Sequence, residues 1–145
     1  MANPTLFDRL FTSTPASDFQ QNYWPDRTCQ SHGALSRLPK PLQDPMLNNL
    51  EALTTRYQGQ VSFGNAKTGS RTVAVEHISP DMLLKMGLSL YLPEIERMVP
   101  GLTELLREAE SVLGLPPGCT RIGAFIAPEE NGVTCHMDAE EVFSI

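Results

Sequence analysis

The chain has 145 residues, of which 41% are apolar, and this is enough for one domain with a hydrophobic core. Its formal net charge is −6, from 17 acidic and 11 basic residues, and the basic residues form no cluster along the sequence. The composition argues against extensive disorder, and the charge argues against a nucleic-acid partner or an anionic membrane surface.

The cysteines and the hydropathy pattern indicate in which cellular compartment the protein is expected. Cys29, Cys119 and Cys135 have no paired spacing, so a disulfide framework is not expected. The first residues lack the basic and apolar regions of a signal peptide, and no apolar stretch is long enough to cross a membrane. We therefore expect a cytoplasmic protein without a membrane partner.

The first third of the chain is predicted to be mainly helical. Two short helices are expected in residues 1–27, followed in residues 28–44 by a short strand and a proline-rich bend. Asp44-Pro45 then predicts a helix start, because aspartate is a good N-cap and proline suits the first turn. Apolar residues between Met46 and Leu53 would form the buried stripe of that helix.

Strands and a further short helix are predicted in the middle of the chain. Residues 60–63 and 71–76 indicate two strands joined by a hairpin loop. Ser79-Pro80-Asp81 indicates the start of a helix that ends at Gly87, and residues 88–92 are expected to be extended.

The clearest predicted helix runs from about residue 100 to residue 113. Its apolar side chains share one face and its charged side chains share the other, as in a helix packed on a core. The predicted buried face comprises Leu102, Leu105, Leu106, Ala109, Val112 and Leu113, and the predicted solvent face comprises Glu104, Arg107, Glu108 and Glu110. In the N-terminal region, Tyr23 and Trp24 are also expected to be largely buried.

From residue 119 onward the pattern is strand-like. Strands are predicted at Thr120–Ala127 and Val133–Asp138, with a turn at residues 128–132 and a third strand beginning at residue 142. The order of the elements predicts an α+β to mainly β fold, in which a helical N-terminal part covers a β core.

His136 and Asp138 are the residues with the clearest chemical meaning. They lie two apart in a predicted strand, so their side chains and that of Thr134 point to one face. An imidazole and a carboxylate on one face are two thirds of a facial triad, which holds non-heme Fe(II) and leaves coordination positions open. The competing interpretation is an edge strand with a solvated polar face, because a short His-x-Asp motif also occurs by chance.

The residues around this pair resemble a known family. Residues 121–128, a glycine-containing turn, the His136-x-Asp138 pair and residues 141–145 are similar to the metal-site region of cupin-like JmjC-type 2-oxoglutarate oxygenases. Three earlier segments of this chain also resemble the family. Residues 19–27 resemble its Phe…Tyr-Trp-Pro helix, residues 32–39 resemble the strand and turn after that helix, and residues 91–95 resemble the segment that leads to the metal strand.

The resemblance implies a double-stranded β-helix, the fold of cupins and jelly rolls. Residues 1–118 would form the helix-rich cover, and residues 119–145 would begin the core with the metal strand. Fe(II) would be bound by His136, Asp138 and a distal histidine, and a later Lys, Arg or other polar side chain would hold the 2-oxoglutarate carboxylate.

The third iron ligand is not expected among residues 1–145. His32 and His77 precede the pair, in segments that resemble cover strands or loops. The distal histidine and the 2-oxoglutarate-binding side chain are therefore expected beyond Ile145, which makes the chain one continuous domain truncated after its first core strands. A short protein that completes its barrel as a homodimer is the alternative.

The function implied by the resemblance is an Fe(II)- and 2-oxoglutarate-dependent dioxygenase, specifically a hydroxylase. His136 and Asp138 would be the metal ligands, and Thr134 would line the pocket. The substrate, whether protein, peptide or small molecule, is not indicated. Two alternatives stay open, namely a non-catalytic cupin-like binding or assembly module and a metal-dependent cupin enzyme that does not use 2-oxoglutarate.

Overall fold

The computed structural model describes residues 5–11, 13–33, 35–65, 69–74, 76–129, 131 and 142–143. Within these residues the fold is α+β, with five α-helices, three short 3-10 helices and a four-stranded antiparallel sheet. The predicted α+β class is confirmed. No helix in this described part of the chain has the length and apolar character that crossing a membrane requires.

The chain forms two compact units whose sequences are interleaved. Residues 1–53 and 94–122 form unit 1, and residues 54–93 and 123–145 form unit 2. The structure does not test the predicted division into residues 1–118 and 119–145, so it stays a prediction.

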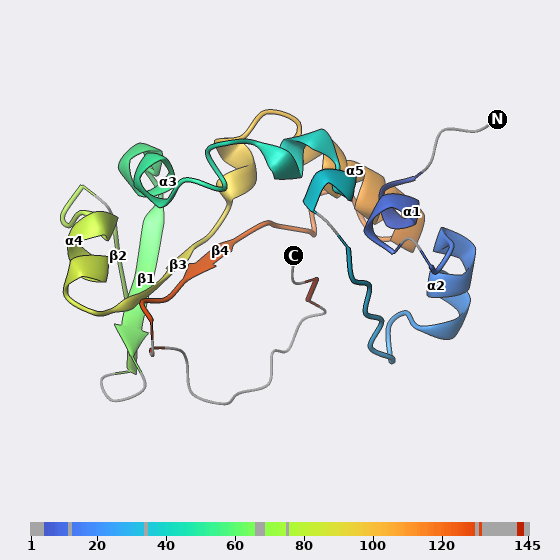
Figure 1. The fold of residues 1–145 in the computed structure, drawn as a ribbon, viewed down its shortest axis with the longest axis horizontal. Coiled ribbons are helices and arrows are strands. Elements are labelled where there is room, and N and C mark those ends of the chain that lie inside the picture. Colours follow the sequence, from blue (N-terminus) through green and yellow to red (C-terminus); the bar gives the residue numbers. More distant parts are fainter. Residues whose placement is uncertain are drawn as a thin grey trace. The chain divides into compact units, whose positions relative to one another are not determined.

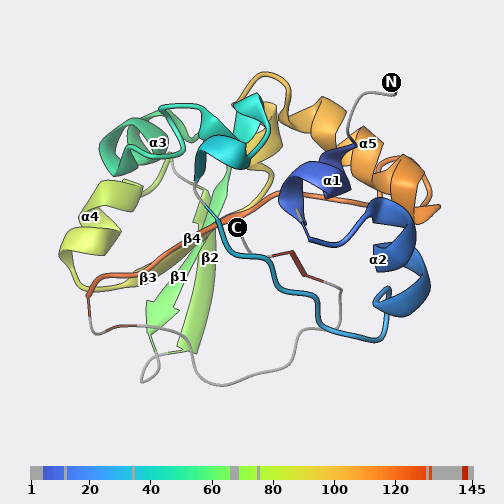
Figure 2. The same cartoon turned by 45° about the vertical axis from the view of Figure 1, so that its right-hand side comes forward.

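Unit 1 is built around the amphipathic helix α5, which packs against α1, η2 and η3. Both ribbon views show α1 beside α5 (Figures 1 and 2). Leu102 and Leu105 of α5 are buried, as predicted, whereas Leu106 and Val112 are only partly buried. The elements of unit 1 are α1 (Leu6–Leu10), α2 (Ala16–Asn22), η1 (Leu35–Arg37), η2 (Lys40–Gln43), η3 (Ile95–Arg97) and α5 (Leu102–Leu113).

Aromatic rings pack α1 against α2. The ring centroids of Phe7 and Phe19 are 5.1 Å apart, and those of Phe11 and Phe19 are 4.9 Å apart. Phe7 and Phe19 are buried, which makes them the centre of this cluster. Tyr23 and Trp24 lie at its edge and are only partly buried, so their predicted burial is confirmed only in part.

The predicted helix start at Asp44-Pro45 is wrong. The helix α3 (Leu50–Arg56) begins later, where the Asn49 side chain accepts a hydrogen bond from the Ala52 N–H at 2.9 Å. Asp44 instead accepts from the Met46 N–H at 2.8 Å and closes a local turn. Asparagine and aspartate are equally good N-caps, so the sequence offers two starts and the second is used.

The strand expected in residues 28–44 is also not found among the described residues of that segment. The backbone forms the 3-10 helices η1 and η2 there instead. The side-chain amide of Gln43 donates to the carbonyls of Ser36 and Leu38, which fixes the bend around Pro39.

Unit 2 contains the sheet, whose strands follow the order β2-β1-β3-β4 and are all antiparallel to their neighbours (Figure 1). Helix α4 packs against β3, with Leu83 buried. The predicted hairpin, the short helix and the extended segment are confirmed, with bounds shifted by a few residues. The elements are β1 (Gln60–Asn65), β2 (Gly69–Ala74), α4 (Pro80–Lys85), β3 (Ser89–Leu92) and β4 (Ala124–Ile126).

The two faces of the sheet differ in character. Val61, Leu90 and Leu92 share one face and are fully buried. One row across the opposite face consists of Thr72, Ser62, Tyr91 and Phe125, which are partners in successive strands. Tyr91 and Phe125 are 43% and 52% exposed, so this second face carries two neighbouring accessible aromatic rings.

Candidate metal centre

The residues predicted to bind metal, His136 and Asp138, lie outside the described residues, as does Thr134. Their predicted common face and pocket therefore stay predictions. What the structure does describe is the chain that leads to them, which consists of strand β4 and the turn after it.

Strand β4 places the start of this segment against the sheet. Its outer residues pair with β3, Ala124 with Leu92 and Ile126 with Leu90. Beyond β4, the Asn131 N–H donates to the Pro128 carbonyl at 3.1 Å, a hydrogen bond typical of a turn, at the place where the turn is predicted.

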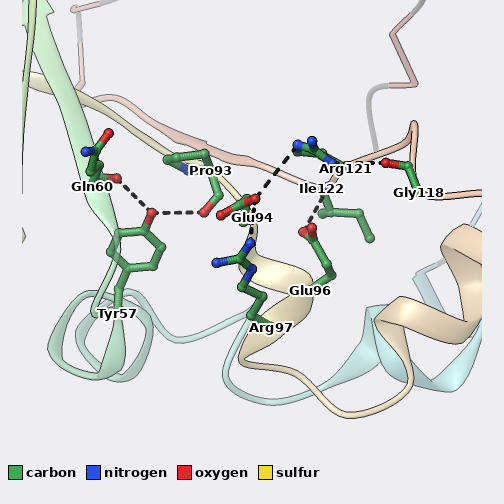
Figure 3. A network of polar contacts seen from close by, with 9 residues as sticks. All are labelled: Tyr57, Gln60, Pro93, Glu94, Glu96, Arg97, Gly118, Arg121 and Ile122. Carbon is green, nitrogen blue, oxygen red and sulfur yellow. Dashed lines mark hydrogen bonds and ion pairs between the residues drawn. The ribbon is translucent and has the colours of Figure 1, made fainter.

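Strand β4 is shorter than the predicted strand Thr120–Ala127. The backbone before it is held by side chains of other elements instead of by a neighbouring strand. The Ile122 N–H donates to Glu96 Oε2 at 3.1 Å (Figure 3). The Ile122 carbonyl accepts from the Ile95 N–H at 2.9 Å. Because these groups are already paired, residues before Ala124 do not join the sheet ladder.

The prediction that Glu110 lies on the solvent face of α5 is also wrong, since only 2% of the residue is exposed. Its Oε1 accepts from the Gly118 N–H at 2.9 Å, the Thr120 N–H at 3.1 Å and the Thr120 hydroxyl at 2.7 Å. Its Oε2 accepts from Arg107 at 2.6 Å. A carboxylate with four donors can be buried because its lone pairs are satisfied.

The electrostatics of Glu110 follow from these contacts. Burial by itself would raise the pKa of Glu110. The hydrogen bonds from Thr120, from Arg107 and from the Gly118 amide favour the charged form and together lower the pKa from 4.5 to about 2. Glu110 therefore stays ionised and binds the loop that precedes β4.

Sequence reasoning missed Glu110 and Glu96 as loop anchors. One signal was available, because the residues of the Leu115-Pro116-Pro117-Gly118 turn and those just after it lie outside the predicted helix that ends at residue 113. Their N–H groups need acceptors, and carboxylates on a neighbouring helix can supply them. A charged residue at the end of an amphipathic helix should therefore be checked against the loop that follows it.

Exposed ion pairs also involve the segment of unit 1 that precedes β4. Glu94 accepts from Arg97 at 2.9 Å and lies 3.8 Å from Arg121, while Arg121 also donates to the Gly118 carbonyl at 3.4 Å (Figure 3). Both arginines are more than half exposed, so each pair contributes little to stability.

Within unit 2, Tyr57 joins the start of β1 to the end of β3. Its hydroxyl lies 2.7 Å from the Gln60 carbonyl and 2.9 Å from the Pro93 carbonyl (Figure 3). The ring packs over Gly59, where any side chain would collide with it. This buried tyrosine fixes the position of β3, the strand on which β4 pairs.

The exposed aromatic row has a similar glycine. The ring of Tyr91 lies over Gly123, the residue before β4, and a Cβ atom at Gly123 would collide with that ring. An aromatic side chain covering a glycine at a sheet edge compensates for the packing that the glycine lacks.

The described residues contain no candidate metal-binding group of their own. There, no three His, Cys, Asp or Glu side chains lie close enough together to hold a metal ion. His32 is exposed in unit 1, and His77 is exposed in unit 2 with its Nε2 3.6 Å from Glu76. Neither histidine is therefore joined by two further ligands within the described chain.

Comparison of the sequence with known protein families gives no match, and comparison with curated proteins gives none either.

Proposed function

We propose that this chain belongs to an Fe(II)- and 2-oxoglutarate-dependent oxygenase of the cupin/JmjC type, acting as a hydroxylase. The observation that carries the proposal is the His136-x-Asp138 pair, which follows the antiparallel strand β4 and a hydrogen-bonded turn in the sequence. An antiparallel sheet with helices in the N-terminal part of the chain supports a cupin-type core, of which residues 119–145 would be the beginning.

The donor set fits this metal. One imidazole nitrogen and one carboxylate oxygen are ligands typical of non-heme Fe(II), and a third protein ligand completes the facial triad. Bound iron would supply the activation of O2 for oxidation of a substrate C–H bond, with 2-oxoglutarate as cosubstrate. In this proposal, His136 and Asp138 hold the metal, Thr134 lines the pocket, and the distal histidine comes from outside residues 1–145.

The proposal also includes a class of substrate and a cellular compartment. The net charge of −6 disfavours a nucleic-acid substrate, which leaves a protein, a peptide or a small molecule. We place the enzyme in the cytoplasm, where free cysteines persist and Fe(II) stays reduced.

The test replaces the two proposed ligands in the full-length protein. His136→Ala and Asp138→Ala should each abolish Fe(II) binding and the formation of succinate from 2-oxoglutarate, while the circular dichroism spectrum stays unchanged. His77→Ala is the matched control, because His77 is an exposed histidine in the same unit. Normal succinate formation in either ligand variant would overturn the proposal.

A further inference from the structure

We propose that Met82 and Met86 form a redox-sensitive modification site, at which a hydroperoxide oxidises both thioethers to sulfoxides while the protein stays folded. The modification turns one face of helix α4 from apolar to polar. Both residues belong to unit 2 and to the described part of the chain. This site does not depend on the proposed oxygenase function.

The two side chains differ in exposure from the other methionines that the structure describes. Met82 is 57% exposed and Met86 is 66% exposed, whereas Met46 is 8% exposed and Met98 is partly buried. An exposed thioether reacts with peroxide directly, but a buried one reacts only when the fold opens around it. Oxidation of the folded protein should therefore be selective for Met82 and Met86.

Helical spacing places the two methionines side by side on the surface. Met82 lies in α4, and Met86 follows the helix directly, with its N–H donating to the Met82 carbonyl at 3.0 Å. Residues four apart on a helix are neighbours on one face. Helix α4 packs against β3 and Leu83 is only 1% exposed, so the side of Leu83 is the packed side. The methionine pair forms an apolar strip that faces solvent.

The oxidation needs no catalytic group from the protein. A sulfur lone pair attacks one oxygen of the hydroperoxide, the O–O bond breaks and an S–O bond forms. The sulfur loses two electrons, and the second oxygen takes the proton and leaves as an alcohol, or as water when the oxidant is hydrogen peroxide. The sulfoxide is polar, and a thiol-dependent reductase reverses the step, because two thiols become a disulfide and the oxygen leaves as water.

The attachment of α4 to unit 2 does not use the reacting sulfurs. Leu83 is buried, and the end of the helix is held by backbone hydrogen bonds. The Gly87 N–H donates to the Leu84 carbonyl at 2.9 Å, and the Leu88 N–H donates to the Leu83 carbonyl at 3.2 Å. Sulfoxide oxygens at two exposed positions remain hydrated, whereas a sulfoxide at Met46 would place a polar group in the core of unit 1.

The first experiment treats the folded full-length protein with hydrogen peroxide and follows each methionine by mass spectrometry of tryptic peptides. Trypsin separates Met46, Met82, Met86 and Met98, because a Lys or Arg lies between each successive pair. Met82 and Met86 should oxidise at least roughly fivefold faster than Met46, with Met98 between them. In denaturing urea all four should oxidise at the same rate. Native rates at Met82 and Met86 no faster than the rate at Met46 would overturn the inference.

The second experiment measures the change in surface character. Peroxide treatment should shorten the retention of the wild type on a hydrophobic-interaction column and leave its circular dichroism spectrum unchanged. The double variant Met82→Leu/Met86→Leu keeps the strip apolar without sulfur, so peroxide should change its retention much less. Met46→Leu is the matched control, because Met46 is buried and this variant should respond to peroxide as the wild type does. An equal loss of retention in the double variant, or unfolding of the wild type on oxidation at Met82 and Met86, would contradict the proposal.

Discussion

A few side chains fix the backbone of this protein where regular hydrogen-bond ladders end. Glu110 binds two amides and a hydroxyl of the loop before β4, and Tyr57 lies within hydrogen-bond distance of two carbonyls at the ends of β1 and β3. A buried polar group of this kind is costly when its partner is removed, because the remaining group is left without water. The stability of the molecule should therefore be sensitive to conservative changes at these two residues.

The contribution of Glu110 should depend on pH. Its pKa is about 2 in the folded protein, against an ordinary value of 4.5, so the unfolded chain takes up the proton first as the pH falls. Its contribution is therefore complete above about pH 4.5 and is lost as the pH falls towards 2. Urea unfolding of the wild type and Glu110→Gln should show a stability difference that shrinks over this range.

The control for this measurement is Glu104→Gln in the same helix. Glu104 is exposed, and replacing an exposed residue changes the unfolding free energy by no more than about 0.5 kcal/mol. A stability difference between wild type and Glu110→Gln that stays constant from pH 6 to pH 2 would contradict the assigned ionisation of Glu110.

Tyr57→Phe should lower the unfolding free energy by about 1–2 kcal/mol, because the Gln60 and Pro93 carbonyls lose their shared donor. The measurement is chemical denaturation followed by circular dichroism. Tyr91→Phe serves as the comparison, since Tyr91 is 43% exposed on the open face of the sheet and should change stability little. Equal losses in the two variants would show that the hydroxyl of Tyr57 has no special role.

At the scale of elements, helix α5 and strand β4 show where sequence reasoning works and where it stops. The 3.6-residue period located α5 and its buried leucines, because apolar periodicity reports burial directly. The same period predicts Glu110 on the solvent face, which is wrong. Periodicity within a helix carries no information about a loop that returns to pack against that helix. The length of β4 was overestimated for the related reason that Glu110 and Glu96 occupy the amides before it.

The core role of α5 can be measured with one leucine. Leu102 is fully buried, so Leu102→Ala should lower the unfolding free energy by about 2–5 kcal/mol through lost burial and the cavity left behind. Leu50→Ala is the control, because Leu50 is 50% exposed in α3. A loss below about 0.5 kcal/mol for Leu102→Ala would mean that α5 does not support the core of unit 1.

At the scale of the whole molecule, the sequence predicts the α+β class and the order of most elements, but not the two interleaved units. Long-range grouping depends on contacts between segments that share no local pattern, such as α1 and α5. The structure does not test the predicted metal ligands, because His136 and Asp138 lie outside the described residues. Their prediction rests on their spacing and on the resemblance to a family.

The ligand count gives a prediction for the molecule as a whole. The proposal assigns two of the three iron ligands to residues 1–145, and a facial triad requires three. Residues 1–145 alone should therefore bind Fe(II) weakly and form no succinate when they are assayed beside a longer form of the protein. Full activity of residues 1–145 would place the third ligand among them, and His32 and His77 would be the first residues to replace.

The interleaving of the two units also sets an order for events during synthesis. The residues that complete the sheet strands β1, β2 and β3 leave the ribosome before Glu94, whereas unit 1 needs residues up to 122. Helix α1 is therefore made early but must wait for α5, the helix that packs against it. Until α5 is synthesised, the surface of α1 that packs against α5 stays exposed, and exposed apolar surface makes a nascent chain prone to aggregation.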